Sequence, residues 1–491
     1  MSQLPILQKE ILAKKCAPIK IMQFGEGNFL RAFVDWLVQK MNDSGEYDGH
    51  VVVVQPLENG RVAALAEQDG LYTLILQGLD ENGVAQRPHK VIDVLDDFVN
   101  PYSQYEKYLS YAESKDLEVV ISNTTEAGIA FDPEDVKRDF SKETPHSYPG
   151  KLYALLERRY EKLGKNYGLA IIPCELIDDN GDRLHEVLLE LAKAKGASEG
   201  FIDFLDNSCH YTSTLVDRIV PGFPRDEFES LCEEFGYIDN NMVKGEYFHL
   251  YVLKNEPFVM QKFPVHKVGL HAIYVDDIHP YKARKVRILN GSHTALVPVA
   301  YLSGKNEVRE ALLDENIHGF LLNLINKETL PTISTADAPK FAADVMDRFL
   351  NPYVHHALMS IALNSTSKWK ERDLPILLED LKKGIVPHHL IFSFAALIAF
   401  YRGIRTVNGL REEIKLADNP EYLAEWQRIW TRFDREGGVQ AIVDEILSKT
   451  DFWGINLLEV PSFPREELRD DLVLILQKGC YEALKEKFPR A

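Results

Sequence analysis

Three polar side chains on one segment, Lys285, Asn290 and His293, could act together on a single oxygen atom. The segment begins just after Pro280 and its apolar residues recur at helical spacing, which predicts an α-helix. On an α-helix Asn290 and His293 lie about 140° and about 80° around the axis from Lys285, so the three side chains share one sector. A ketone–alcohol interconversion needs such a set, with one group that moves a proton and donors that stabilise charge on the oxygen.

The same three residue types are also typical of a helix face that is solvated, or of polar groups satisfied within a core. Spacing alone therefore leaves both interpretations open. Gly291 and Ser292 follow directly in mid-helix, where a glycine costs about 1 kcal/mol. A glycine at that place indicates that another group approaches the backbone closely. Asn290 and His293 adjoin strongly apolar turns, so we expect them to be partly buried and to need polar partners.

A strand, a glycine turn and a helix near the N-terminus form a candidate nucleotide-binding motif. Residues 18–24 have the pattern of a short buried strand, Gly25 and Gly27 form the turn, and residues 33–41 have that of an amphipathic helix. The first glycine would permit the tight turn, and the second would let the backbone approach a pyrophosphate at the helix N-terminus. Leu30 occupies the third glycine position, so the motif is truncated and an ordinary strand-to-helix turn remains an alternative.

The rest of the chain predicts the scaffold that must position these groups. Residues 50–54, 117–122 and 168–174 are further buried strands that alternate with helical stretches, which indicates a parallel sheet with ligands at the carboxyl ends of its strands. From residue 281 onward the pattern is mostly helical. We therefore predict an α/β protein with a Rossmann-like, mostly parallel sheet domain over residues 1–276, followed by a mainly α-helical domain over residues 277–491.

The residue that would choose between NAD and NADP is not evident. An acidic side chain usually follows the second strand of such a domain and binds the ribose. Here Gln55 and Pro56 stand at that place, with Glu58 and Arg61 beyond them. The pattern alone leaves the choice between the two cofactors open.

Composition excludes several classes of function. The chain has 491 residues, enough for two large domains with their own cores, and its 45% hydrophobic and 27% charged residues are ordinary for a globular protein. The net charge of −19 argues against nucleic acid and against an anionic membrane surface as partners. An anionic substrate would need a local basic cluster, and one candidate cluster comprises Lys282, Arg284, Lys285 and Arg287.

Neither a disulfide framework nor a metal site is indicated. The five cysteines are odd in number and far apart, and no two of them have metal-ligand spacing. The adjacent histidines at 355–356 and 388–389 would diverge by about 100° on a helix. No signal peptide is evident, and the longest apolar run, residues 390–401, is too short to cross a bilayer. We expect a cytoplasmic protein without a bound metal; its oligomeric state is left open.

The spacing of Lys285, Asn290 and His293 resembles the signature of the polyol-specific long-chain dehydrogenases, the family of mannitol dehydrogenase. The resemblance spans nearly the whole chain, in blocks at residues 21–36, 68–73, 122–129, 172–177, 213–220, 348–352 and 395–403. It implies an NADH-dependent, reversible reduction of the hexuronate D-tagaturonate to the aldonate D-altronate, without a metal.

The resemblance also implies a role for individual residues. Lys285 is the general acid and base, while Asn290 and His293 bind and polarise the reacting oxygen. The residues assigned to the cofactor are Phe24, Gly25, Glu26, Gly27, Asn28, Phe29, Leu30, Arg31 and Thr125. Those assigned to the substrate are Asp217, Lys282 and Lys368. To act as a base Lys285 must give up its proton near neutral pH, and the cations Lys282, Arg284 and Arg287 are expected to promote this by charge repulsion.

Two departures from the mannitol enzymes bear on the substrate. Leu176 stands where those enzymes carry an asparagine that helps to hold the oxyanion, and Lys282 stands where they carry a glutamate. The lysine adds positive charge where a uronate would bring its carboxylate, which favours a uronate over mannitol. Fructuronate (mannonate) reduction and mannitol oxidation remain alternatives. A catalytically silent NAD-binding sensor is an alternative of another class, but it would be expected to lack one of the three signature residues.

Overall fold

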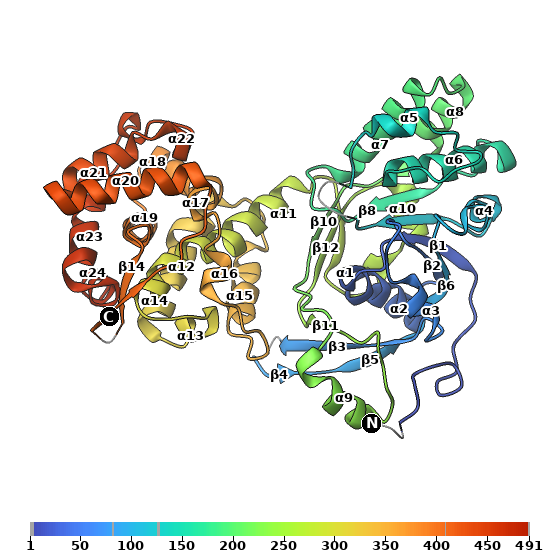
Figure 1. The fold of residues 1–491 in the computed structure, drawn as a ribbon, viewed down its shortest axis with the longest axis horizontal. Coiled ribbons are helices and arrows are strands. Elements are labelled where there is room, and N and C mark those ends of the chain that lie inside the picture. Colours follow the sequence, from blue (N-terminus) through green and yellow to red (C-terminus); the bar gives the residue numbers. More distant parts are fainter. Residues whose placement is uncertain (1–3, 81–82, 125–127, 408, 490–491) are drawn as a thin grey trace. The chain divides into compact units, whose positions relative to one another are not determined.

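The computed structural model describes residues 4–80, 83–124, 128–407 and 409–489 of the chain. It divides into two compact units (Figure 1). Unit 1 comprises Met1–Asp80 and Gln86–Ile278, and unit 2 comprises Glu81–Ala85 and His279–Ala491. Throughout the described residues, no helix combines the length and the apolar character that crossing a bilayer requires.

The main sheet of unit 1 has six strands in the order β6-β2-β1-β7-β8-β9. Every neighbouring pair is parallel, with Phe24 of β1 opposite Val54 of β2 and Ser122 of β7. This is the strand order of a doubly wound dinucleotide-binding sheet. The chain adds β2 and β6 on one side of β1, and then β7, β8 and β9 on the other side. The strands are β1 (Ile19–Phe24), β2 (His50–Val54), β6 (Leu95–Val99), β7 (Val119–Ser122), β8 (Ala170–Pro173) and β9 (His210–Tyr211).

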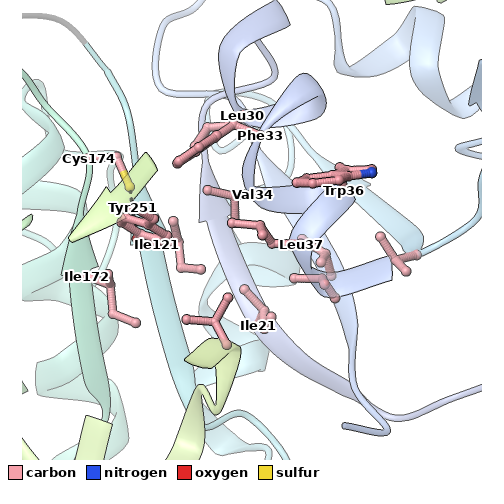
Figure 2. Packing of buried hydrophobic residues seen from close by; sticks show 14 of the residues in the cluster. Ile21, Leu30, Phe33, Val34, Trp36, Leu37, Ile121, Ile172, Cys174 and Tyr251 are labelled. Atoms are coloured by element: carbon pink, nitrogen blue, oxygen red, sulfur yellow. Dashed lines mark hydrogen bonds between the residues drawn. The ribbon is translucent and has the colours of Figure 1, made fainter. Parts of the chain in front are cut away.

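Helices and smaller sheets cover both faces of this sheet, which explains the continuous apolar character of its strands. On one face Ile21 and Ile121 pack with Trp36 and Leu37 of α2 (Val34–Ser44), as Figure 2 shows. On the other face β-strand side chains pack against α6 (Tyr148–Leu163) and α7 (Asn180–Ala194). The predicted Rossmann-like sheet is confirmed.

Two smaller sheets complete unit 1, and the sequence pattern did not reveal them. One has the order β11-β3-β4 with β5 paired to β3, and the other has the order β10-β12-β13. Their strands are β3 (Tyr72–Leu79), β4 (Ala85–Gln86), β5 (His89–Ile92), β10 (Thr214–Asp217), β11 (Val243–Glu246), β12 (Leu250–Lys254) and β13 (Ala272–Val275). The shorter helices are α1 (Asn28–Ala32), α3 (Val62–Ala66), α4 (Tyr105–Ser110), α5 (Pro133–Lys137), α8 (Glu199–Asp203), α9 (Phe228–Phe235) and α10 (Pro257–Lys262).

Unit 2 is mainly helical, as predicted, and is built around α12 (Ser292–Leu302) and α19 (His388–Phe400). The apolar run of α19 is buried on all sides, and the Ser393 hydroxyl donates to the carbonyl of Ala295 in α12, at 2.9 Å. The surrounding helices are α11 (His279–Arg284), α13 (Val308–Leu312), α14 (Glu315–Leu324), α15 (Ala338–Phe349), α16 (Leu358–Ile361), α17 (Ser365–Arg372), α18 (Leu374–Lys382), α20 (Pro420–Glu436), α21 (Val439–Leu447), α22 (Thr450–Trp453), α23 (Arg465–Lys478) and α24 (Cys480–Lys487). A hairpin of β14 (Ile404–Val407) and β15 (Leu410–Glu413), which we did not predict, interrupts them.

The segment that carries the polar trio is not a continuous α-helix, and this corrects the sequence-based prediction. Between α11 and α12 the segment η5 (Lys285–Gly291) is a π-helix. A π-helix closes each turn with a hydrogen bond between residues five apart, one more than in an α-helix. Asn290 therefore follows Lys285 by one turn, rather than lying about 140° around the axis as α-helical spacing would place it.

The group that approaches Gly291 is the carboxyl of Asp373. A Cβ atom on Gly291 would lie 2.9 Å from the Asp373 Oδ1 atom, so any larger residue at the end of the π-helix would require the Asp373 side chain to shift. Both carboxyl oxygens of Asp373 are buried and have no hydrogen-bond partner within the described parts of the chain. Burial raises the pKa of Asp373 well above its usual range, and the neighbouring Arg372 lowers it by less.

We predict that Asp373→Asn becomes progressively more stable than the wild type as the pH rises. Above about pH 4 the unfolded chain loses the Asp373 proton, while the folded protein keeps it up to its raised pKa. Wild-type stability therefore falls by up to about 1.4 kcal/mol per pH unit in that interval, and an asparagine has no proton to lose. Unfolding temperatures of both proteins between pH 5 and pH 7 measure the difference.

The matched control is Asp470→Asn, which removes an exposed carboxylate from α23 in the same unit. It should show no gain that grows with pH. A difference between Asp373→Asn and the wild type that stays constant, or reverses, over this pH range would contradict a buried, protonated carboxyl at Gly291.

Candidate active site

The glycine turn after β1 has the geometry of a nucleotide-binding loop. Gly25 has φ of 120°, its N–H donates to the Val54 carbonyl at 3.1 Å, and a Cβ atom there would lie 2.8 Å from the Asn123 carbonyl oxygen. Gly27 is the N-cap of α1, and a Cβ atom on it would meet nothing within 4 Å. The first glycine is thus required by the fold, while the second faces open space, where a ligand can approach the backbone.

Leu30, at the third glycine position, is part of the core. Its side chain is buried, and its Cδ1 atom would lie 3.3 Å from a Cβ atom on Gly25. Phe29 beside it stacks on Phe33, with ring centroids 5.2 Å apart. The truncated motif is therefore a complete turn in which a leucine fills the space beneath the first glycine.

The Glu26 side chain is hydrogen-bonded to the loop after β2. The backbone N–H of Arg61 donates to Glu26 Oε1 at 3.1 Å, and a Cβ atom on Gly60 would lie 2.4 Å from that same oxygen. Gln55 is buried, and its amide donates to the carbonyls of Leu57 and Glu58, each at 2.8 Å. The side-chain amide of Gln55 is thus hydrogen-bonded within its own loop, whereas the Glu58 side chain is exposed.

A cavity of about 490 Å³ opens at the carboxyl ends of β2 and β6. Its lining includes Glu58, the apolar Val62, Ala63 and Phe98, and the polar Asn100. The size falls within the range of small-molecule sites, and parallel sheets of this kind bind ligands at the same edge.

A buried carboxylate, Glu175, joins the ends of β7 and β8; it begins the polar segment 175–181, which the sequence offers as a candidate rim of the site. Glu175 accepts hydrogen bonds from the Ser122 hydroxyl at 3.0 Å, and from the backbone N–H and hydroxyl of Thr124 at 3.0 and 3.1 Å. Burial raises its pKa. Its signal in the sequence is an acidic residue placed directly after a buried strand. Glu175 thus positions the loop that leads to Thr125, which itself lies outside the described residues.

Two other residues of interest in unit 1, Leu176 and Asp217, occupy contrasting environments. Leu176, which replaces an asparagine of the mannitol enzymes, has 64% of its surface exposed. Asp217 is buried at the end of β10, opposite Leu250 of β12.

Arg31 is buried and does not face the open side of the glycine turn. Its Nη2 donates to Asn28 Oδ1 at 2.7 Å, and its Nη1 donates to the Asn241 carbonyl. The Tyr72 hydroxyl donates to the Arg31 carbonyl at 2.7 Å. The guanidinium therefore binds Asn28 and the Asn241 carbonyl, and the assignment of Arg31 to the cofactor stays a prediction.

Two cations near Lys285 have carboxylate partners, which corrects the expected origin of charge repulsion. Arg284 is buried, forms an ion pair with Asp337 and lies over the Phe341 ring at 4.4 Å. Arg287 Nη1 donates to Glu379 Oε2 at 2.8 Å and to the Thr332 carbonyl at 2.6 Å. These pairings neutralise both charges, while Lys282 and Lys285 are partly buried in α11 and the π-helix.

His293 is held as a neutral ring among positive charges. It stacks on Phe349 with centroids 4.2 Å apart and meets the His356 ring edge-on at 5.1 Å. Burial first, and then the charges of His356, Arg348, Arg372 and Lys368, hold the pKa of His293 well below its usual range. Its Nε2 atom is buried and has no hydrogen-bond partner in the described portion of the protein. This nitrogen can accept a hydrogen bond from a ligand hydroxyl, or donate one to a ligand oxygen.

Helix α17 brings two cations toward the same segment. Lys368 and Arg372 are four residues apart and therefore share one helix face. Arg372 Nη1 donates to the Thr294 hydroxyl at 3.1 Å and to the Asn290 carbonyl at 3.5 Å, while Lys368 Nζ donates to the Ile361 carbonyl at 2.8 Å. The sequence analysis missed Arg372, although its spacing from Lys368 could have indicated it.

A metal centre has no ligand set here. Over the ranges that the structure describes, no group of three or more His, Cys, Asp or Glu side chains is placed to hold a metal ion. The candidate residues of unit 2 are an amine, an amide and a neutral imidazole beside several cations, a combination suited to proton transfer and to the stabilisation of an oxyanion.

Comparisons with known proteins agree with this architecture. Residues 19–267 match the family model of the mannitol dehydrogenase Rossmann domain, and residues 277–470 match that of the mannitol dehydrogenase C-terminal domain. Altronate oxidoreductases of Escherichia coli, from strains O6:K15:H31 and O139:H28 among others, are 43% identical to the chain over 474 residues, covering 95% of this chain and 96% of theirs.

Two solved structures share the fold. A D-sorbitol dehydrogenase in substrate-free form has a TM-score of 0.80 at 22% identity, covering 98% of this chain and all of its own. The Pseudomonas fluorescens mannitol 2-dehydrogenase, in a ternary complex with NAD and D-mannitol, has a TM-score of 0.66 at 21% identity, covering 96% of this chain and 94% of its own. By its sequence matches over both units, the chain belongs to the mannitol dehydrogenase family.

Proposed function

We propose that the protein catalyses the reversible, NADH-dependent reduction of D-tagaturonate to D-altronate. The observation that carries this proposal is the neutral His293 ring, whose buried Nε2 has no partner among the described residues and which is surrounded by cations. Such a site suits a substrate that brings both a carbonyl oxygen and a carboxylate. The identity of 43% to altronate oxidoreductases over almost the whole chain supports the same substrate pair.

The glycine turn of unit 1 fits a dinucleotide. The open space in front of Gly27 leaves room for a pyrophosphate against the backbone, from Phe24 to Asn28. The cavity beside Glu58 is of a size to take the adenosine end. An acidic side chain at that place favours the ribose hydroxyl of NAD over the 2′-phosphate of NADP. When bound, the nicotinamide supplies the hydride in the reduction and accepts it in the oxidation.

The π-helix and the start of α12 supply the proton and the hydrogen bonds. In the reduction Lys285 donates its proton to the substrate oxygen as negative charge develops there, and in the oxidation it takes that proton back. The Asn290 amide and the His293 Nε2–H donate hydrogen bonds to the same oxygen. Because His293 is neutral, it can stabilise the oxygen without competing with Lys285 as the proton donor.

The cations of α17 suit the carboxylate of a uronate. Lys368 and Arg372 lie on one helix face, and Arg372 contacts the Asn290 carbonyl and the Thr294 hydroxyl through its Nη1. A guanidinium presents several donors in a plane, which is the geometry that carboxylates prefer. In this proposal Lys282 adds to the same positive field, and Asp217 accepts hydrogen bonds from sugar hydroxyls.

Lys285 is the proposed proton-transfer group, and its removal tests that role. Lys285→Ala should lower the rate of tagaturonate reduction by at least about a hundredfold, because proton transfer to the nascent alkoxide loses its donor. NADH binding, measured by fluorescence titration, should be unchanged. Lys382→Ala, which removes an exposed lysine of α18, is the control and should keep the wild-type rate. A Lys285→Ala protein that retains a tenth of the wild-type rate would refute the assignment.

The preferred substrate can be tested with three ketoses, of which two carry a carboxylate. Initial rates of NADH oxidation with D-tagaturonate, D-fructuronate and D-fructose should be highest with tagaturonate. Arg372→Gln should lower kcat/KM for tagaturonate about tenfold or more, because a charge-assisted hydrogen bond to the carboxylate is lost. The residual rate with fructose, which has no carboxylate, should not fall. Arg372→Lys should recover part of the lost rate.

Two outcomes would decide against the uronate assignment. A wild-type preference for fructose would favour a mannitol dehydrogenase, and a preference for fructuronate would favour the mannonate reaction. Equal losses for tagaturonate and fructose in Arg372→Gln would mean that Arg372 supports the site but does not bind a carboxylate.

A further inference from the structure

Unit 2 contains a second cavity, of about 430 Å³. It lies where Leu302 of α12, Ala399 of α19 and Ile475 of α23 meet the start of α24 and the β14–β15 hairpin. None of the signature residues lines it. Leu302 and His293 are at opposite ends of α12, about 13 Å apart along the helix axis. The cavity is therefore separate from the site described above.

Four cations line the cavity, and three of them have a carboxylate partner outside its lining. Its charged lining residues are Arg402, Arg405, Arg411 and Lys478, and no Asp or Glu is among the lining residues. The carboxylates that pair with these cations, Glu412, Asp434 and Glu486, do not line the cavity. In a chain of net charge −19, a concave surface lined by cations alone is a local exception.

Two of the four cations retain hydrogen-bonding capacity. Arg402 Nη2 donates to Asp434 at 2.8 Å, but its Nε is buried and has no partner in the described chain. The Arg411 side chain is exposed, and it makes no hydrogen bond or ion pair with any residue that the structure describes. The backbone of Arg411 is nevertheless fixed, because Arg411 pairs with Thr406 in the register of the hairpin.

Arg405 has a different, structural role. Its Nε donates to Glu412 at 2.8 Å, and its Nη1 donates to the carbonyls of Tyr301 and Lys305 at 3.3 and 3.4 Å. It thereby satisfies carbonyls at the C-terminal end of α12, a usual position for a basic residue. Arg402 is held by Asp434 and lies over the Trp430 and Phe433 rings, which leaves its Nε free to bind a ligand, whereas Arg411 has no such contact among the described residues.

The remaining lining residues define the kind of ligand. Leu302, Ala399, Ile404 and Ile475 give the cavity an apolar part, and Thr406 and Gln477 add neutral polar groups. A cavity of this volume fits a small organic molecule better than a single inorganic ion. Guanidinium groups beside apolar surface suit an anion that carries its charge on a carbon skeleton.

We propose that this cavity binds a compact organic anion, bearing carboxylate or phosphate groups, through Arg402 and Arg411. The inference does not depend on the proposed reaction, since no residue of the cavity takes part in it. Ligand binding at the Leu302 end of α12 also places an anion on the same helix that carries His293.

Isothermal titration of the full chain in low-salt buffer tests the proposal, with citrate as the carboxylate probe and glucose 6-phosphate as the phosphate probe. Low salt is needed because ions screen such contacts. At least one probe should bind saturably at or below about 10 mM, and Arg411→Gln should weaken that binding about tenfold, as expected for the loss of a charge-assisted hydrogen bond. The probe that binds more tightly identifies the anionic group.

Two control variants separate this cavity from other basic surface. Arg435→Gln removes an exposed arginine of α20 that does not line the cavity, and Arg372→Gln weakens the cations around His293. Arg435→Gln should bind the probe as the wild type does, and Arg372→Gln should retain the binding that Arg411→Gln weakens. Absence of saturable binding of either probe, an equal loss in Arg435→Gln, or a loss confined to Arg372→Gln would overturn the proposal.

Discussion

A neutral imidazole surrounded by positive charges is the condition on which the rest of the site depends. The His293 ring stacks on Phe349, and its burial together with the cations Arg348, Arg372 and Lys368 makes a positive charge on the ring unfavourable. The ring therefore offers a hydrogen bond without carrying charge. Arg284 and Arg287, by contrast, are paired with carboxylates. Within a chain of net charge −19, this arrangement concentrates positive potential where an anionic substrate would be held.

In both units a buried carboxyl group fixes the backbone that carries the reactive or binding groups. Asp373 packs against Gly291 at the end of the π-helix, and Glu175 joins the ends of β7 and β8 through Ser122 and Thr124. Burial raises the pKa of each. Such groups lower the stability of the folded protein, as active sites often do, and in exchange they hold a turn in one geometry.

The sequence was sufficient to predict the parts of the fold that depend on local pattern. Continuous apolar strands such as residues 50–54 predict a sheet buried on both faces, and the helical periodicity after residue 281 predicts the helical unit. The resemblance to the mannitol dehydrogenase family is confirmed by the matches over both units. Gly291 correctly indicated a close approach to the backbone.

Features that depend on distant partners could not be predicted in this way. The π-helical turn changes which residues face one another, but it leaves no mark in composition or spacing. Arg31, Arg284 and Arg287 bind Asn241, Asp337 and Glu379, which lie far from them along the chain, so a supporting role for these three side chains could not be predicted. Arg372 is placed beside the π-helix by its contacts with Thr294 and Asn290, which its spacing from Lys368 alone does not reveal.

A measurement of the charge state of His293 tests most directly whether the imidazole is neutral. NMR spectra of the protein labelled with ¹⁵N-histidine, with the His293 signals assigned by their loss in His293→Gln, report whether the ring carries one proton or two. At pH 6.5, where a free imidazole is about half protonated, the account predicts a neutral His293 ring. Signals of a doubly protonated imidazolium at that pH would contradict it.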